Sequence, residues 1–230
     1  MHGVVLLAAG SGKRMGGEIS DKILADIGSS NAFRMCMHAF ANFDDINSMV
    51  IVFRDQKQKT KLQSELKKIT PLNQDIFFSF VKGGKERSDS VKNGLNALPK
   101  SCKFAHIHDC ARPMIRRETI SLLIKNVRQS KATALARPVT NTIRKKLSNE
   151  EFSQTETPTR IDLWEMETPQ SAPTKWFIEG YAKADKMNIP ITDDMHAIEL
   201  ISKKIVLLDP GYPNPKITHL HDLKLISCLI

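Results

Sequence analysis

A glycine-rich turn followed by cationic side chains lies near the start of the chain. Residues 6–15 read LLAAGSGKRM, and Asp21 and Lys22 lie a few positions further on. Small residues let a backbone approach a ligand closely, and their amide hydrogens can converge on one anion. Lys13, Arg14 and Lys22 add positive charge directly after these donors. This combination predicts a binding site for a polyanion, of which a triphosphate is the obvious candidate.

Two common phosphate-binding motifs are excluded at this turn. A Walker A loop requires a glycine where Leu7 stands, and a serine or threonine where Arg14 stands. The Rossmann dinucleotide fingerprint requires a third glycine where Met15 stands. A Gly-Ser-Gly sequence after a strand is also compatible with an ordinary tight turn, so the turn alone leaves both interpretations open.

Four further clusters of polar residues follow expected strands. Asp109 lies in one of them, where a carboxylate could hold a ribose hydroxyl or a divalent metal that bridges phosphates. Each cluster also has an ordinary structural explanation: Asp109 could cap a loop or pair with Arg112, and Asp193 could be the N-cap of a helix. The clusters are Gly83–Ser90, His108–Pro113, Ile191–Asp194 and Pro215–Thr218.

Short β-rich runs alternate with helical patterns along the chain. This alternation predicts an α/β fold with a mainly parallel sheet, helices on both of its faces, and ligands at the carboxyl ends of the strands. The expected strands are Val4–Ala9, Ser48–Phe53, Ile76–Val81, Phe104–His108, Thr133–Pro138 and Ile205–Leu208. The expected helices are Ala32–Phe40, Lys57–Ile69, Ser88–Leu98, Glu118–Gln129, Thr174–Met187 and Asp193–Ile201.

Residues 141–168 interrupt this alternation with a polar segment that has few apolar positions. We expect Thr142–Leu147 and Arg160–Met166 to form the two arms of a hairpin that projects from the sheet. A projecting hairpin with little core of its own usually rests on a partner subunit, which predicts a homodimer. A disordered surface excursion is the alternative. Residues 1–230 are expected to form a single domain that includes this arm.

Length and composition are those of a globular protein with an excess of positive charge. The chain has 230 residues, 41% hydrophobic and 26% charged, which is enough for one well-packed domain. Its formal net charge of +9 suits an anionic ligand and leaves nucleic acid open as a partner. However, the lysines are scattered, only 6% of the residues are aromatic, and no RNA-binding pattern interleaves with them. We therefore expect no nucleic-acid partner.

The four cysteines are widely spaced, without a Cys-x-x-Cys pair, which indicates neither a zinc site nor a disulfide framework. No apolar run reaches membrane-spanning length, and the N-terminus enters a strand without the features of a signal peptide. Reduced thiols in the cytoplasm, and no association with a membrane, are the expected setting.

Taken together, these motifs resemble the 2-C-methyl-D-erythritol 4-phosphate cytidylyltransferase family of the non-mevalonate isoprenoid pathway. The resemblance runs from Val4 to about Leu223 and includes the stretch Arg160–Gln170. It implies a Rossmann-like nucleotidyltransferase sheet and a dimer-clasping arm over residues 141–168. It also implies transfer of a cytidylyl group from CTP to the polyol phosphate, with Mg²⁺ bound beside CTP.

The resemblance also implies roles for individual residues. Arg14 and Lys22 are the catalytic cations at the α-phosphate, and Asp109 lies near the ribose and the metal. Arg160, supplied by the arm of a partner subunit, and Lys216 hold the acceptor. The other nucleotide-binding residues implied are Ala8, Ala9, Gly10, Gly12, Lys13, Gly84, Lys85 and Ser90. The other acceptor-positioning residues implied are Arg112, Thr142, Thr168 and Thr192.

Two departures and several alternatives accompany this resemblance. Pro215 precedes Lys216 where a non-proline is common in the family. Asp21 precedes Lys22 where the family usually has proline, and we expect Asp21 to pair with a neighbouring cation. A cytidylyltransferase for another polyol phosphate, such as ribitol 5-phosphate, is the nearest alternative, although those relatives generally carry valine where Ala111 stands. A sugar-1-phosphate nucleotidyltransferase fits the second half poorly. A basic nucleic-acid-binding module would explain the charge, but not the glycine turns at strand ends.

Overall fold

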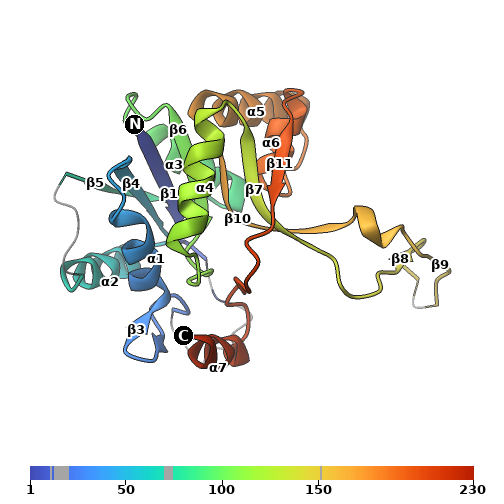
Figure 1. Ribbon diagram of the computed structural model, residues 1–230, viewed down its shortest axis with the longest axis horizontal. Helices are drawn as coiled ribbons and strands as arrows, with labels where there is room; N and C mark the ends of the chain where they lie inside the picture. The colour runs from blue at the N-terminus through green and yellow to red at the C-terminus, as the bar shows by residue number, and fades with distance from the viewer. Residues whose placement is uncertain (11, 13–20, 70–74, 151) are drawn as a thin grey trace.

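The structure is a computed structural model that describes residues 1–10, 12, 21–69, 75–150 and 152–230. Within these residues, seven strands form one sheet in the order β11-β7-β10-β6-β1-β4-β5 (Figure 1). Neighbouring strands are parallel, except that β10 is antiparallel to both β6 and β7. The strands are β1 (His2–Leu7), β4 (Ile46–Phe53), β5 (Phe77–Lys82), β6 (Phe104–Asp109), β7 (Ala132–Pro138), β10 (Trp164–Pro173) and β11 (Ile205–Leu208).

Helices cover both faces of the sheet because successive side chains of a strand point to opposite faces. The helices are α1 (Ala32–Ala41), α2 (Gln56–Lys67), α3 (Arg87–Ala97), α4 (Arg117–Arg128), α5 (Thr174–Met187), α6 (Asp194–Leu200) and α7 (Leu220–Leu229). On β1, Val4 and Leu6 pack into a cluster with α1, α2, α4 and α7. Val5, between them, packs into the opposite cluster with α3, α5 and α6. The predicted α/β architecture is therefore confirmed.

Side-chain caps fix where several of these helices begin. Asn31 accepts a hydrogen bond from the backbone N–H of Arg34 at the start of α1. Asp55 caps α2 in the same way through Gln58, and Asp193 caps α6 through the N–H of His196 at 2.9 Å. Such caps satisfy backbone donors that have no partner within the helix. The prediction that Asp193 could be the N-cap of a helix is therefore confirmed.

The prediction for residues 141–168 was wrong in its pairing. Residues 160–166 do not pair with residues 142–147; instead the short strands β8 (Lys145–Lys146) and β9 (Thr155–Glu156) pair with each other. A 3-10 turn, η2, covers Arg160–Asp162, and Trp164 begins β10 in the main sheet. The sequence of β10 does not read as a strand, because it contains two prolines and several polar residues, and proline is rare in strands in the middle of a sheet.

The segment between β7 and β10 extends away from the body of the sheet (Figure 1). Its base is closed by a hydrogen bond from the N–H of Val139 to the carbonyl of Leu163 at 3.0 Å. Large apolar side chains on this arm are exposed: Phe152 is 90% accessible and Ile161 is 84% accessible. Contact of this arm with a partner subunit stays a prediction.

Three further elements were not predicted. The two-residue strands β2 (Asp26–Ile27) and β3 (Ser30–Asn31) form a small hairpin. Helix α7 follows His219, where the side chains of His219 and Asp222 cap each other's backbone. None of the helices in the described part of the chain is long and apolar enough to cross a lipid bilayer.

Candidate active site

Two adjoining cavities lie at the carboxyl ends of β1 and β6. The larger has a volume of about 780 Å³ and the smaller about 340 Å³. Arg87, Asp109 and Lys216 line both cavities and therefore form the wall between them. This is the edge of the sheet where parallel α/β folds bind their ligands.

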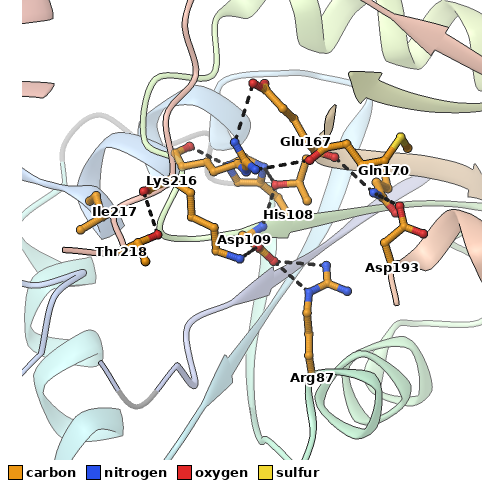
Figure 2. A network of polar contacts seen from close by, with 12 residues as sticks. Arg87, His108, Asp109, Glu167, Gln170, Asp193, Lys216, Ile217 and Thr218 are labelled. Atoms are coloured by element: carbon orange, nitrogen blue, oxygen red, sulfur yellow. Dashed lines mark hydrogen bonds and ion pairs between the residues drawn. The ribbon is translucent and has the colours of Figure 1, made fainter. Parts of the chain in front are cut away.

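Asp109, the last residue of β6, is the centre of this wall (Figure 2). Arg87 Nε donates to Asp109 Oδ1 at 3.2 Å, and Lys216 Nζ donates to Oδ2 at 2.5 Å from another side. Burial alone would raise the pKa of Asp109, but the charges of Arg87 and Lys216 hold that pKa well below its usual range. Asp109 is therefore ionised at neutral pH.

A buried carboxylate holds Arg87 in this position. Both Nη atoms of Arg87 donate to Asp194, at 3.0 and 2.8 Å, and the hydroxyl of Tyr181 donates to the same carboxylate at 2.6 Å. Asp194 is completely inaccessible to solvent. Burial would lower the pKa of Arg87, but the carboxylates of Asp194 and Asp109 raise it instead. The guanidinium is thus a fixed positive charge between the two cavities.

The smaller cavity is lined by Arg112 and by residues of β10. Arg112 Nη1 donates to the carbonyl of Asn214 at 2.8 Å, and the Glu167 carboxylate lies 3.8 Å away. The alternative that Arg112 pairs with Asp109 is therefore wrong, because Glu167 on β10, which was not predicted as a strand, is its ion-pair partner. Burial lowers the pKa of Arg112 and raises that of Glu167.

The backbone approaches the larger cavity closely at two turns. Gly12 has φ of +62°, in the left-handed region that favours glycine. At Gly84 an added Cβ would lie 2.2 Å from the Cβ of Asp89, so no larger residue fits. The N–H of Gly84 donates to the hydroxyl of Ser90 at 3.1 Å, which fixes this turn against the first turns of α3.

Lys22 also lines the larger cavity, although little of it is accessible. Its Nζ donates to the carbonyl of Ile217 at 2.6 Å, which connects it to the segment that carries Lys216. The expectation that Asp21 pairs with a neighbouring cation is confirmed, and the cation is Arg54, at 3.4 Å.

The structure brings most of the predicted site residues to one of the two cavities. Arg160 and Thr142 lie on the arm and line neither cavity; Arg160 Nη1 donates instead to the carbonyl of Thr140 at 2.8 Å. Lys13 and Arg14 lie outside the described residues. The larger cavity includes Ala8, Ala9, Gly10, Gly12, Lys22, Gly84, Lys85, Ser90, Asp109 and Lys216. The smaller includes Asp109, Arg112, Thr168, Thr192 and Lys216.

The sequence assigned no role to several other residues that line these cavities, among them Arg54, Arg87, Glu167 and Gln170. Arg87 lies within the Gly83–Ser90 cluster, so its place after a strand was a usable signal. Gln170 donates to Asp193 at 2.9 Å, a contact between β10 and the N-cap of α6. Such contacts join distant parts of the chain, so no local sequence pattern predicts them.

Comparison with solved structures identifies the fold. The 4-diphosphocytidyl-2C-methyl-D-erythritol synthase of Anaerococcus prevotii superimposes with a TM-score of 0.83, at 22% identity, over 100% of this chain and 95% of that one. The 2-C-methyl-D-erythritol 4-phosphate cytidylyltransferase of Thermus thermophilus gives 0.75, also at 22% identity, over 100% and 98%. The fold, with cavities at the ends of its parallel strands, is that of an α/β nucleotidyltransferase.

Sequence comparison identifies the family to which the chain belongs. The family description "2-C-methyl-D-erythritol 4-phosphate cytidylyltransferase" matches residues 2–230. A relative of that name from Clostridium botulinum is 34% identical over 222 residues, 96% of this chain and 94% of its own. Another, from Clostridioides difficile, is 31% identical over 230 residues, 100% of this chain and 94% of its own. The chain belongs to the 2-C-methyl-D-erythritol 4-phosphate cytidylyltransferase family.

Proposed function

We propose that this protein transfers the cytidylyl group of CTP to 2-C-methyl-D-erythritol 4-phosphate, a step of isoprenoid precursor biosynthesis. The products are 4-diphosphocytidyl-2-C-methyl-D-erythritol and pyrophosphate. Family membership supports the reaction. The observation that carries it is the wall of Arg87, Asp109 and Lys216 shared by two adjoining cavities, because a group transfer requires two substrates to meet at one place.

CTP occupies the larger cavity in this proposal. The backbone of Ala8, Ala9 and Gly10, at the end of β1, contacts the nucleotide, and Gly12 and Lys13 continue this contact. Gly84, Lys85 and Ser90, at the start of α3, border the cytidine. Backbone amides and lysine side chains are suitable donors to phosphate and base.

The polyol phosphate occupies the smaller cavity. Lys216 and Arg112 provide the positive charge that a phosphate monoester requires. The hydroxyl of Thr192 can donate to a phosphate oxygen, and the hydroxyl oxygen of Thr168 can accept from a hydroxyl of the acceptor. Thr168 is held by His108, whose Nδ1 lies 3.0 Å from its hydroxyl oxygen.

The reaction needs no general base, because a phosphate monoester is largely ionised at neutral pH. An oxygen of the acceptor phosphate attacks the α-phosphorus of CTP. The new P–O bond forms as the bond to the bridging oxygen breaks, and pyrophosphate leaves with that electron pair. The activation barrier comes from the repulsion between two approaching anions and from the extra negative charge that develops at the α-phosphate. Lys22 and Arg14 stabilise that charge, and the cavities hold the reactants in line.

A Mg²⁺ ion fits this site through Asp109. Among the described residues no three or more His, Cys, Asp or Glu side chains gather at a metal-binding point, so phosphate oxygens would complete the coordination. Mg²⁺ commonly binds in this way, through one or two carboxylates together with substrate phosphates. Asp109 is an ionised oxygen ligand on the wall of the larger cavity. The metal would neutralise charge on the phosphates.

A homodimer would complete the acceptor site. Neither Arg160 nor Thr142 lines the larger or the smaller cavity of its own chain, and the arm that carries them exposes Phe152 and Ile161. Exposed apolar side chains on a projecting segment favour burial against another subunit. We therefore assign Arg160 of the partner subunit to the acceptor phosphate. The proposed location is the cytoplasm, since all four cysteines, each in the described part of the chain, are free thiols.

The reaction is tested by incubating the purified protein with Mg²⁺, CTP and each acceptor in turn, and measuring pyrophosphate release. The nucleotide product is identified by mass spectrometry. We expect turnover with 2-C-methyl-D-erythritol 4-phosphate and CTP, and little with ATP or UTP. Comparable kcat/KM with ribitol 5-phosphate would reassign the acceptor. Salt-sensitive RNA binding without CTP turnover would reject the proposal.

Mixing two impaired variants tests the role of the partner subunit. Lys216→Ala and Arg160→Ala are each expected to lower turnover strongly when the acceptor is held well below the KM of either variant. In a mixed dimer, one site would have both an intact Lys216 and an intact partner Arg160. After random exchange, half the dimers are mixed, so about one quarter of wild-type activity should return. If Arg160 acts within its own chain, mixing restores nothing. Lys183→Ala, at an exposed position on α5, is the surface control.

A further inference from the structure

Two side chains outside the predicted site hold Asp21, the residue before Lys22. Gln58 Nε2 donates to Asp21 Oδ2 at 2.6 Å, and Arg54 Nη2 donates to the same oxygen at 3.4 Å. Only 7% of Asp21 is accessible to solvent. The backbone continues this arrangement, because the N–H of Leu24 donates to the carbonyl of Asp21 at 3.1 Å. Because Asp21 is held by these contacts, they also fix the backbone position of its neighbour Lys22.

The same two side chains bond to the backbone that leaves β1. Gln58 Nε2 donates to the carbonyl of Ala8 at 2.9 Å, and Arg54 Nη1 donates to the carbonyl of Gly10 at 3.0 Å. Ala8 and Gly10 both line the larger cavity. Asp21 is therefore tied to the end of β1 twice, through Gln58 to Ala8 and through Arg54 to Gly10.

Arg54 itself is held from the other side. Its Nε donates to Asp55 Oδ2 at 2.8 Å, and its backbone N–H donates to Gln58 Oε1 at 2.7 Å. Asp55 is also the N-cap of α2 through the N–H of Gln58, at 2.8 Å. Each of these groups thus makes at least two contacts, so the guanidinium has a defined place at the edge of the larger cavity.

We infer that Asp21, Gln58 and Arg54 form a positioning cluster, which sets Lys22 and the carbonyl of Gly10 relative to bound CTP. The inference rests on the proposed cytidylyl transfer and assigns to that reaction residues that do not themselves react. Arg54 acts through Gly10 and Asp21, and Asp21 acts through Lys22. A displacement of about 1 Å at a catalytic group can cost about 100-fold in rate, so such a cluster has a measurable effect.

The ionised form of Asp21 is the one that the cluster requires. Burial raises the pKa of Asp21, while the hydrogen bond from Gln58 and the charge of Arg54 act in the opposite direction. The charge of Lys61 on α2 also acts to lower this pKa, and Asp21 interacts electrostatically with the thiol of Cys110. As pH falls, protonation of Asp21 removes the negative charge that attracts Arg54 and weakens the hydrogen bond from Gln58, so the cluster loosens.

The test compares Arg54→Ala, Arg54→Lys, Asp21→Asn and the double variant Arg54→Ala/Asp21→Asn. Arg34→Ala is the matched control, because Arg34 also pairs with a carboxylate, at 3.3 Å from Glu65, but lines neither cavity. We expect kcat to fall about 10- to 100-fold in Arg54→Ala and Asp21→Asn, with the Kd of CTP changed less than about 3-fold. Arg54→Lys should recover part of kcat, and the double variant should be no worse than the poorer single variant.

Two readouts separate positioning from a general loss of stability. The acidic decline of kcat caused by protonation of Asp21 should disappear in Asp21→Asn. Amide hydrogen exchange over residues 21–24 should accelerate in Arg54→Ala and in Asp21→Asn, but not in Arg34→Ala. The inference is overturned if Arg54→Ala weakens CTP binding as much as it lowers kcat/KM, or if Arg54→Ala and Asp21→Asn both behave like Arg34→Ala. Wild-type protein without turnover would reject the proposed function, while the exchange data would still decide whether the cluster exists.

Discussion

Asp194 offers a test of the central electrostatic arrangement, because it holds Arg87 but lies outside both cavities. Replacing it with alanine leaves the Arg87 guanidinium without two hydrogen bonds and the Tyr181 hydroxyl without its acceptor. Breaking a buried ion pair by removing one partner typically costs about 3–5 kcal/mol. For a chain of this length, that loss corresponds to a decrease in Tm of roughly 6–20 °C.

Asp185→Ala is the matched control. Asp185 also accepts two contacts from one cation, Lys92 Nζ, at 2.9 and 3.1 Å, but its side chain is 59% accessible. An exposed ion pair contributes at most about 1 kcal/mol, so this variant should unfold close to wild type. The two variants therefore remove the same chemical group and differ mainly in burial.

Urea unfolding followed by tryptophan fluorescence and circular dichroism measures both free energies. The midpoint should shift for Asp194→Ala without a change in the m-value. At a temperature well below both transitions, Asp194→Ala should also lose turnover, because Arg87 is no longer fixed between the cavities. A free energy of unfolding within about 1 kcal/mol of that of Asp185→Ala would refute the argument that burial makes this pair important.

Three further outcomes are expected. Lys216→Ala should raise KM for the polyol phosphate about 10- to 100-fold, since a charged hydrogen bond contributes about 1.5–3 kcal/mol; unchanged steady-state kinetics would contradict its role in the smaller cavity. Gly180→Ala should destabilise the protein by about 1–3 kcal/mol, because the added Cβ would lie 2.2 Å from the carbonyl oxygen of Ala197; a wild-type melting temperature would exclude this clash. Burial lowers the pKa of His2 to about 4 and of His106 to about 3, so the unfolded state binds more protons below about pH 6.5. The unfolding free energy should therefore decrease as pH falls from 6.5 towards 4, and His106→Gln should flatten that slope.

The sequence predicted elements whose apolar residues follow a regular period. The strand around Val5 and the helix around Leu123 were placed within two residues, because burial on one or both faces dictates their side chains. Strand β10 was missed because Thr168, Gln170 and Ser171 are buried and polar. Each is satisfied by a partner on another element, and such partners exist only after folding.

The sequence predicted those site residues that lie in motifs after expected strands. Asp109 and Lys216 were both singled out, and the fold brings them together, Asp109 from the end of β6 and Lys216 from the segment between β11 and α7, although they are 107 residues apart in the sequence. Their direct pairing was not predicted, nor was the bond between Arg87 and Asp194, because side-chain pairing depends on packing that leaves no local pattern. Arg54 was missed for the same reason, since its partners are a backbone carbonyl and a carboxylate from two other segments.

Strand β10 has a consequence for dissecting this molecule. One uninterrupted backbone joins the root of the arm at Trp164 to Thr168 and Gln170 beside the smaller cavity. Only the part of the arm that lies between β7 and β10 can therefore be deleted without affecting the site. A deletion between Val139 and Leu163 would spare every strand of the main sheet, whereas a cut that passes Trp164 would also remove part of the wall that receives the acceptor.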